Sequence, residues 1–355
     1  MPAAIIANLI MLLTFIVAAI LYSIDAELYN RSSQEDQLLE WMTFWAFVVA
    51  SIGFFRFSIL DRRERGGLPW FAIGLGFFCI IVALEEISWG QRLFAYRPPE
   101  YFLEQNYQQE FNVHNVLRTD LRMAAMQLVL LGYGVLLPAV SLINGLGRWL
   151  ARVRVLVSPP ALIPGFIATS GLYAWYPEDY TGEWVECAMG LGFALVATLS
   201  AKNNESVSAL RRVSQTTLVI VALAVGTVAF SRLLQDSDTE RATMARDEIT
   251  LLVRDFESTK LRTRCGIHKR LFTFMREYNQ PYLASGEFAL RLRDNAAHAR
   301  ADYLLDPWNS PYWVRHKCVD GIAVAFVYSF GPNRRRDSTE RRLVDDDIGG
   351  YFVTP

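Results

Sequence analysis

Apolar residues in this chain gather in blocks of about 20, the length that a helix needs to cross the hydrocarbon core of a bilayer. A sliding hydropathy window predicts about seven such membrane-spanning helices. The blocks explain why 52% of the residues are hydrophobic, a high share for a soluble protein. The predicted spans are Ala3–Ser23, Leu38–Leu60, Trp70–Phe94, Met123–Ile143, Val155–Tyr176, Trp184–Ala201 and Thr217–Leu234. We therefore expect a mainly α protein built on a polytopic helical membrane bundle.

Basic and acidic residues alternate between the loops that connect these spans. The basic loops carry Arg62, Arg63 and Arg65, then Arg148, Arg152 and Arg154, then Lys202, Arg211 and Arg212. The positive-inside rule places these loops in the cytoplasm. With seven spans, the N-terminus is then cytoplasmic and the C-terminal part lies beyond the membrane. Membrane lipids are expected partners, whereas a net charge of −1 provides no basic field for nucleic acid.

The chain divides into three predicted regions. Residues 1–215 form a six-span bundle, residues 216–264 the seventh span with an amphipathic extension, and residues 265–355 an α+β domain. The extension has apolar residues near helical spacing and neither Pro nor Gly. Span and extension are therefore expected to form one helix of about 45 residues, some 70 Å long. A further helix is expected near Phe288–Leu305, and a β-hairpin turn at Asp320-Gly321.

Three motifs in the tail occur together in one known protein family. They are Asp306-Pro-Trp-Asn-Ser-Pro, Tyr328-SFGPN and Asp346-Asp347-Ile-Gly, in this order. They resemble the DPWGNPY, S-x-GADG and ADIG segments of type II secretion major pseudopilins. The resemblance covers residues 216–355 and implies a pseudopilin-like extracytoplasmic domain on a long N-terminal helix. It also implies a bacterial inner membrane, with this domain in the periplasm.

The family binds calcium in the loop between its last strands, so the resemblance implies a calcium site here. The matching positions are Asn333, Asp346 and Asp347. Hard oxygen ligands suit this cation. The alternative is a loop closed by Arg–Asp pairs, because arginines that would repel a dication fill it: Arg334, Arg335, Arg336, Arg341 and Arg342.

The start of the last span departs from the pseudopilin pattern. Pseudopilins begin with a Gly, an N-methylated Phe and a nearby Glu, but the run that starts at Ser214 has neither the cleavage Gly nor the Glu. Six spans also precede it. The domain is therefore expected not to polymerise and to serve as an interaction module that docks on an extracytoplasmic or membrane partner protein.

The four cysteines fall into two pairs with different surroundings. Cys79 and Cys187 lie in predicted spans and are expected to be inert packing residues. Cys265 and Cys318 lie in the exported domain, where a disulfide can persist. A disulfide between them and two free thiols are both compatible with the sequence.

The predicted third span ends in the polar run Ala83-LEEISWGQRLF-Ala95. Ionisable residues in a membrane span indicate function. Helical spacing would place four residues of this run on one face: Glu85, Ser88, Trp89 and Arg92. This run and the downstream Glu110-FNVHN segment resemble a family of bacterial multi-span proteins that has no assigned activity. The candidate catalytic residues are Glu85, Glu86, Ser88 and His114.

Two further carboxylates open the sixth span at helical spacing, Glu183 and Glu186. A divalent metal could be held at the membrane boundary by Glu86, His114, Glu183 and Glu186. A Ser88–His114–Glu triad is another arrangement of the same side chains. The alternative is a structural polar network in which Arg92 and Arg118 neutralise the glutamates and Gln91, Asn112 and Asn115 complete the hydrogen bonds.

Two classes of function remain open after the sequence is read. The first is an integral membrane subunit, structural or accessory, whose pseudopilin-like domain docks on a partner complex. The second is a membrane-embedded hydrolase or transferase, dependent on a metal, that acts on a lipid-like substrate at the outer face.

Overall fold

The computed structural model describes most of the chain, in two compact units. Outside the described residues lie 1, 26–27, 30–31, 33–37, 92–97, 100, 103–105, 107–110, 115, 176–180, 202–207, 236–238, 260–263, 297, 320–321, 333–335, 340 and 354–355. The membrane unit comprises Met1–Arg92 and Asn112–Phe230, and the C-terminal unit comprises Leu93–Phe111 and Ser231–Pro355. Each unit has its own hydrophobic core.

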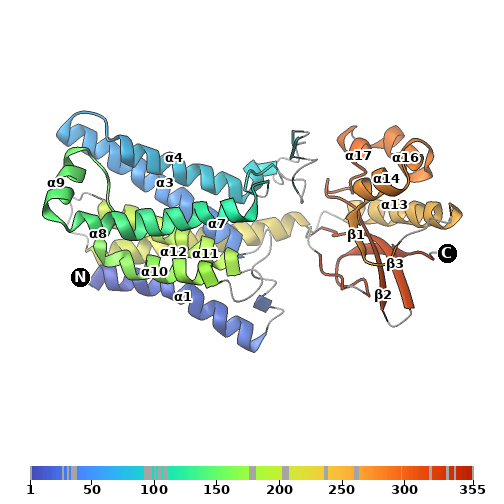
Figure 1. The fold of residues 1–355 in the computed structure, drawn as a ribbon, viewed down its shortest axis with the longest axis horizontal. Coiled ribbons are helices and arrows are strands. Elements are labelled where there is room, and N and C mark those ends of the chain that lie inside the picture. Colours follow the sequence, from blue (N-terminus) through green and yellow to red (C-terminus); the bar gives the residue numbers. More distant parts are fainter. Residues whose placement is uncertain are drawn as a thin grey trace. The chain divides into compact units, whose positions relative to one another are not determined.

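The membrane unit is a bundle of helices that run side by side (Figure 1). Its elements are α1 (Pro2–Ile24), α3 (Leu38–Arg65), α4 (Trp70–Glu86), η1 (Ser88–Gly90), α7 (Thr119–Gln127), η2 (Leu128–Leu136), α8 (Leu137–Ser141), α9 (Asn144–Arg152), η3 (Pro160–Leu162), α10 (Ile163–Trp175), α11 (Thr181–Ser200) and α12 (Ala209–Gln235). In the described part of the chain, five helices are long and apolar enough to cross a membrane: Ala3–Ile24, Leu38–Arg65, Thr119–Ser141, Thr181–Ser200 and Ala209–Phe230. The protein is therefore a multi-pass membrane protein.

The predicted third and fifth spans are shorter than expected. The third was expected to reach Phe94, but α4 ends at Glu86 after 17 residues. The fifth was expected over Val155–Tyr176, but α10 has 13 residues and follows a single turn of 3₁₀-helix. Prolines 159, 160 and 164 explain the second difference, because proline has no backbone N–H to donate and its ring clashes with the preceding turn.

Two backbone groups around the start of α10 are bound by one side chain of α1. The Asn8 side-chain oxygen accepts a hydrogen bond from the Gly165 amide at 2.8 Å. The Asn8 side-chain nitrogen donates to the Ala161 carbonyl oxygen at 2.5 Å. Free backbone groups in an apolar medium cost several kcal/mol each, so Asn8 makes the broken helix tolerable inside the bundle.

The two ends of the bundle differ in charge. At one end the α3–α4 loop meets the α9–η3 loop, where an Arg154 guanidinium nitrogen donates to the Arg65 carbonyl oxygen at 3.2 Å. The Trp70 indole at the start of α4 donates to the Val153 carbonyl oxygen at 2.8 Å. Glu86 closes the far end of α4, roughly 24 Å away at 1.5 Å per residue. The basic loops and Glu86 thus lie at opposite ends of α4, and one buried carboxylate, Asp61, lies at the basic end, where it pairs with Arg65 and Arg154.

The C-terminal unit combines α13 (Thr239–Ser258) with a four-stranded antiparallel sheet in the order β1-β2-β3-β4 (Figure 1). The strands are β1 (Ile267–Arg270), β2 (Trp313–Val319), β3 (Ile322–Ser329) and β4 (Ile348–Tyr351), and the remaining helices are α14 (Leu271–Tyr278), α15 (Tyr282–Ser285), α16 (Glu287–Asn295) and α17 (His298–Tyr303). Val319 pairs with Ile322, so β2 and β3 form an antiparallel hairpin with two residues between these paired positions. The predicted hairpin is confirmed, although its turn residues lie outside the described part.

Two helix predictions for this unit differ from the structure. The helix expected near Phe288–Leu305 is two helices, α16 and α17, and Leu305 instead forms an isolated bridge with Pro311. The long helix is described as α12, which ends at Gln235, and α13, which begins at Thr239. Residues 236–238 lie outside the described part, so the continuity of that helix stays a prediction.

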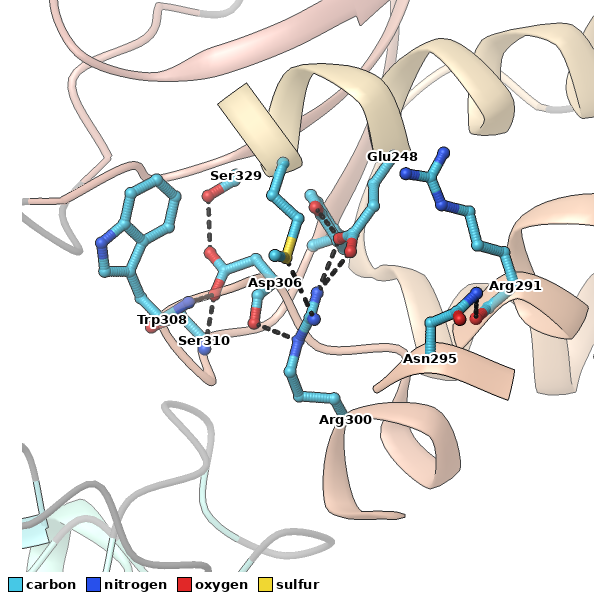
Figure 2. Close-up of polar contacts among 10 residues, drawn as sticks. Glu248, Arg291, Asn295, Arg300, Asp306, Trp308, Ser310 and Ser329 are labelled. Carbon is cyan, nitrogen blue, oxygen red and sulfur yellow. Dashed lines mark hydrogen bonds and ion pairs between the residues drawn. The ribbon is translucent and has the colours of Figure 1, made fainter. Parts of the chain in front are cut away.

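A buried ion pair joins α13 to the helices and strands around it (Figure 2). One Arg300 guanidinium nitrogen donates to both carboxylate oxygens of Glu248, at 2.8 and 2.6 Å. The Tyr312 hydroxyl donates to the same carboxylate at 2.7 Å. Burial, and next the Glu248 charge, raise the pKa of Tyr312, so this hydroxyl stays a donor. This pair could not be predicted from local sequence patterns, because its members are 52 residues apart.

The Asp-Pro-Trp motif organises the neighbouring turn. The fully buried Asp306 carboxylate accepts hydrogen bonds from the Trp308 amide at 3.0 Å and the Ser310 amide at 2.8 Å. It also accepts the Ser329 hydroxyl, at the end of β3, at 2.5 Å. Arg300 donates to the Asp306 backbone carbonyl at 2.8 Å, which links the turn to the ion pair (Figure 2).

Candidate functional site

The helix α4 stops in a turn of unusual backbone conformation. Ser88, Trp89 and Gly90 have φ of 47°, 56° and 80° in succession. Two of these residues carry a Cβ, for which this left-handed region costs about 1 kcal/mol or more each. The helix-face prediction for Ser88 and Trp89 is therefore wrong, because the helix ends before them. Arg92 lies outside the described residues.

The Glu85 carboxylate holds this turn and the loop before α7 together. It accepts the Trp89 indole N–H at 2.7 Å and the Val113 amide at 2.7 Å. It also accepts the His114 amide at 3.2 Å, and the His114 Nδ1 lies 3.5 Å from it. The Asn112 side chain donates to the Ser88 hydroxyl at 3.1 Å. The structure thus joins the two motifs that the sequence analysis singled out.

For part of the predicted site, these contacts favour the alternative of a structural polar network over a catalytic role. His114 lies against Glu85, and Ser88 receives the amide of Asn112, so the contacts described here give the Ser88–His114–Glu triad no support. Arg118 was expected to neutralise the glutamates, but its guanidinium pairs with Asp120 at 2.8 Å. The predicted network member Asn115 lies outside the described residues.

Three other carboxylates converge beside this turn. Glu86 ends α4, while Glu183 and Glu186 occupy the first turns of α11, and one oxygen from each lies within 4.8 Å of the others. All three side chains are half-buried. Of the predicted four-residue metal set, the structure brings together these three, and His114 lies outside the group. We call Glu86, Glu183 and Glu186 the carboxylate cluster.

The charges around the cluster include residues that the sequence analysis missed. Glu186 and Glu183 repel Glu86 most strongly, and Glu40 of α3 adds to the repulsion. His114 and Arg122 lie close enough to Glu186 to attract it. Glu40 and Arg122 both lie at the starts of predicted spans. A charged residue beside an apolar run was the signal that could have identified them as candidate site residues.

The carboxylate cluster is a chemically suitable site for a hard divalent cation. Carboxylate oxygens suit magnesium, manganese and calcium better than they suit soft metals. Three like charges in half-buried surroundings are unfavourable unless protons or a cation neutralise them. The donor set therefore fits the predicted divalent metal at the membrane boundary, with three carboxylates in place of the mixed carboxylate and histidine set.

The predicted calcium loop is described only in part. Asn333, Arg334 and Arg335 lie outside the described residues. One carboxylate oxygen of the largely buried Asp347 accepts the Ser338 amide at 2.6 Å, while the other has no hydrogen-bond partner among the described residues. Burial raises the pKa of Asp347 to about 7, with smaller contributions from the charges of Asp337 and Asp346. Two of the three predicted ligands, Asp346 and Asp347, are thus adjacent in the chain, and Asp337 adds a third carboxylate whose charge acts on Asp347.

The structure pairs Cys265 with Cys318 in a disulfide, with 5.3 Å between their Cα atoms. Cys79 and Cys187 are free thiols buried in the bundle, as expected of packing residues.

Comparisons with protein-family models, with curated proteins and with solved structures return no match for this chain. The two family resemblances therefore rest on their motifs alone.

Proposed function

We propose that this multi-pass membrane protein carries a pseudopilin-like domain on the outer side of a bacterial inner membrane, where the domain docks on a partner protein. The main support is the division of the chain: the C-terminal unit resumes at Ser231, directly after the apolar segment Ala209–Phe230. A compact domain that follows a span at once is held at the membrane surface.

The proposed orientation follows from the two ends of the bundle. In addition to the five long apolar helices, α4 with 17 residues and the Pro160–Trp175 stretch are proposed as short spans. Seven spans put the N-terminus and the C-terminal unit on opposite sides. The basic loops that meet near Arg65 and Arg154 mark the cytoplasmic end, so the C-terminal unit is proposed to be periplasmic.

The sheet edge formed by β4 is the proposed docking surface. β4 is the last strand in the sheet order, and edge strands can pair with a strand of another chain. Two large apolar side chains stand exposed at this edge, Tyr351 at 49% and Val353 at 76%. An exposed apolar pair beside a sheet edge suits a partner that adds a strand and covers both side chains.

Site-specific crosslinking tests this docking. A photoactivatable amino acid at Tyr351 or Val353 of the full-length chain, irradiated in native membranes, is expected to give one discrete adduct with another protein. Leu290 on α16 is the matched control, because it is an apolar side chain of similar exposure, 44%, away from the sheet edge. Adducts at Leu290 as strong as those at Tyr351, or none at either edge position, would contradict docking through β4.

A second candidate function is favoured by the carboxylate cluster: a hydrolase or transferase that depends on a metal and acts on a lipid-like substrate at the outer face. A divalent metal held by Glu86, Glu183 and Glu186 would activate water or polarise a substrate oxygen near the headgroups. The cluster lies at the end of α4 away from the basic loops, so it is proposed to face the outer leaflet.

Metal analysis of the detergent-purified, full-length protein tests this candidate. We expect about one divalent cation per chain, and its loss in the Glu86→Gln Glu183→Gln double variant. The same variant should then melt at a lower temperature, because a bound cation stabilises the folded state. If the cluster is only structural, the glutamines relieve repulsion and raise the melting temperature instead. Glu257→Gln, an exposed glutamate of α13, is the control and should change neither quantity.

A further inference from the structure

One corner of the C-terminal sheet gathers three side chains that bind soft metals. β1 and β2 pair so that Ile267 lies opposite His316. Continuing this antiparallel register by two residues places Cys265 opposite Cys318. Because side chains alternate along a strand, His316 and Cys318 project from the same face of β2. The pleat therefore puts an imidazole next to both sulfur atoms.

The distances between these donors are those of a metal site. The His316 Nε2 lies 3.8 Å from the Cys318 sulfur, and one donor atom from each of Cys265, His316 and Cys318 lies within 4.8 Å of the others. A tetrahedral zinc with metal–sulfur bonds of about 2.3 Å needs donor atoms separated by roughly 3.5–4 Å. His316 and Cys318 already have this spacing, and reduction would let the two sulfurs separate to it.

We propose that the Cys265–Cys318 disulfide and a zinc site made of Cys265, His316 and Cys318 are two alternative states of this corner, selected by the redox environment. Cys265 is exposed, so a dithiol reductant can reach the disulfide, whereas the largely buried His316 is held in place by the sheet. Two thiolates and an imidazole are soft ligands that favour zinc over magnesium or calcium. Three protein ligands leave the fourth zinc position to water.

The conversion from the disulfide to the zinc site requires two electrons and two protons, which the reductant supplies. A small dithiol donates two electrons and two protons, the Cys265–Cys318 bond breaks, and a new sulfur–sulfur bond forms within the oxidised reductant. Zinc then displaces the two thiol protons, which pass to the buffer, and two zinc–sulfur bonds form. Oxidation reverses the sequence and releases the cation, so the corner would release zinc under oxidising conditions.

Cobalt substitution tests the proposal in the full-length, detergent-purified protein. Co²⁺ replaces Zn²⁺ and gives a thiolate-to-metal charge-transfer band only when sulfur ligates it, so cobalt at the carboxylate cluster does not contribute. We expect the reduced protein to develop this band up to one cobalt per chain and the oxidised protein to show none. Zinc should abolish the band by competition.

Two variants complete the test. Cys265→Ser Cys318→Ser retains Cys79 and Cys187, so it reports any signal from the buried thiols of the bundle and should show no band. Loss of a residue that only hydrogen-bonds to a metal ligand typically weakens metal binding by roughly 10- to 100-fold. Because His316 is proposed as a ligand itself, His316→Ala should weaken cobalt binding by more than this. Circular dichroism establishes whether the reduced chain keeps its fold. A folded, reduced protein without the band, a reduced chain that unfolds with or without metal, or equal affinity in His316→Ala would each overturn the proposal.

Discussion

Replacing Glu248 by alanine is expected to destabilise the C-terminal unit by about 3–5 kcal/mol, the cost of leaving a buried charge without its partner. Arg300 would lose both charge-assisted bonds while its side chain is only 10% exposed, and Tyr312 would lose the acceptor of its hydroxyl. Domains of this size are commonly stable by only about 5–15 kcal/mol, so a large share of the stability would be lost.

Pulse proteolysis across a urea series, with the full-length protein in detergent, measures this effect as a shift in the midpoint of cleavage within the C-terminal unit. Glu257→Ala is the matched control, since it removes an exposed carboxylate from the same helix and should leave the midpoint nearly unchanged. The Glu248→Leu Arg300→Met double variant should recover part of the loss, because no unpaired charge stays buried. Equal midpoints for Glu248→Ala and Glu257→Ala would show that the ion pair contributes no net stability.

Gly134 is a position in the membrane unit where one added methyl group should be strongly destabilising. It lies in η2, and a Cβ built there would stand 2.3 Å from Cγ of Phe166 in α10. Phe166 is fully buried, so any shift of its ring would displace close-packed neighbours. Overpacking of this kind typically costs about 1–3 kcal/mol and sometimes more. We expect Gly134→Ala to lower both the melting temperature and the yield of folded protein from membranes.

Gly132→Ala provides a control within the same helix. Its Cβ would meet nothing closer than a methyl group of Leu128 at 3.7 Å, which is ordinary van der Waals contact. Thermal melts of both variants in detergent, followed by size-exclusion chromatography, compare them directly. The packing argument fails if Gly132→Ala melts at or below the temperature of Gly134→Ala.

Much of the fold could be predicted from composition and periodicity. Five helices follow from apolar blocks, because length and hydropathy are local properties of the chain. The ends of α4 and α10 could not be predicted in the same way. The first ends in three left-handed residues that contact Glu85 and Asn112. The second begins after a proline-rich segment, and Asn8 binds two backbone groups around its start. Such ends are set by distant partners that hydropathy does not report.

The candidate site was predictable in its residue types and only partly in its arrangement. Glu183 and Glu186 share a helix face, so their closeness to each other could be predicted from their spacing. Their closeness to Glu86 could not, because it depends on how α11 packs near α4. His114 has the chemistry of a metal ligand, yet the loop geometry places it against Glu85. The buried Glu40 was not predicted to lie near the cluster, because a predicted span can contain one acidic residue near its end without any sign of function.

The hydrogen bonds of Asn8 also bear on how the chain is made. Asn8 precedes Gly165 by 157 residues, so during synthesis α1 enters the membrane long before the proline-broken segment does. The Gly165 amide and the Ala161 carbonyl can therefore find their partner as soon as they leave the aqueous phase. In the opposite order these groups would meet lipid first, with nothing to bind them. We therefore expect that insertion in chain order, with α1 before α10, favours correct folding of the proline-rich segment.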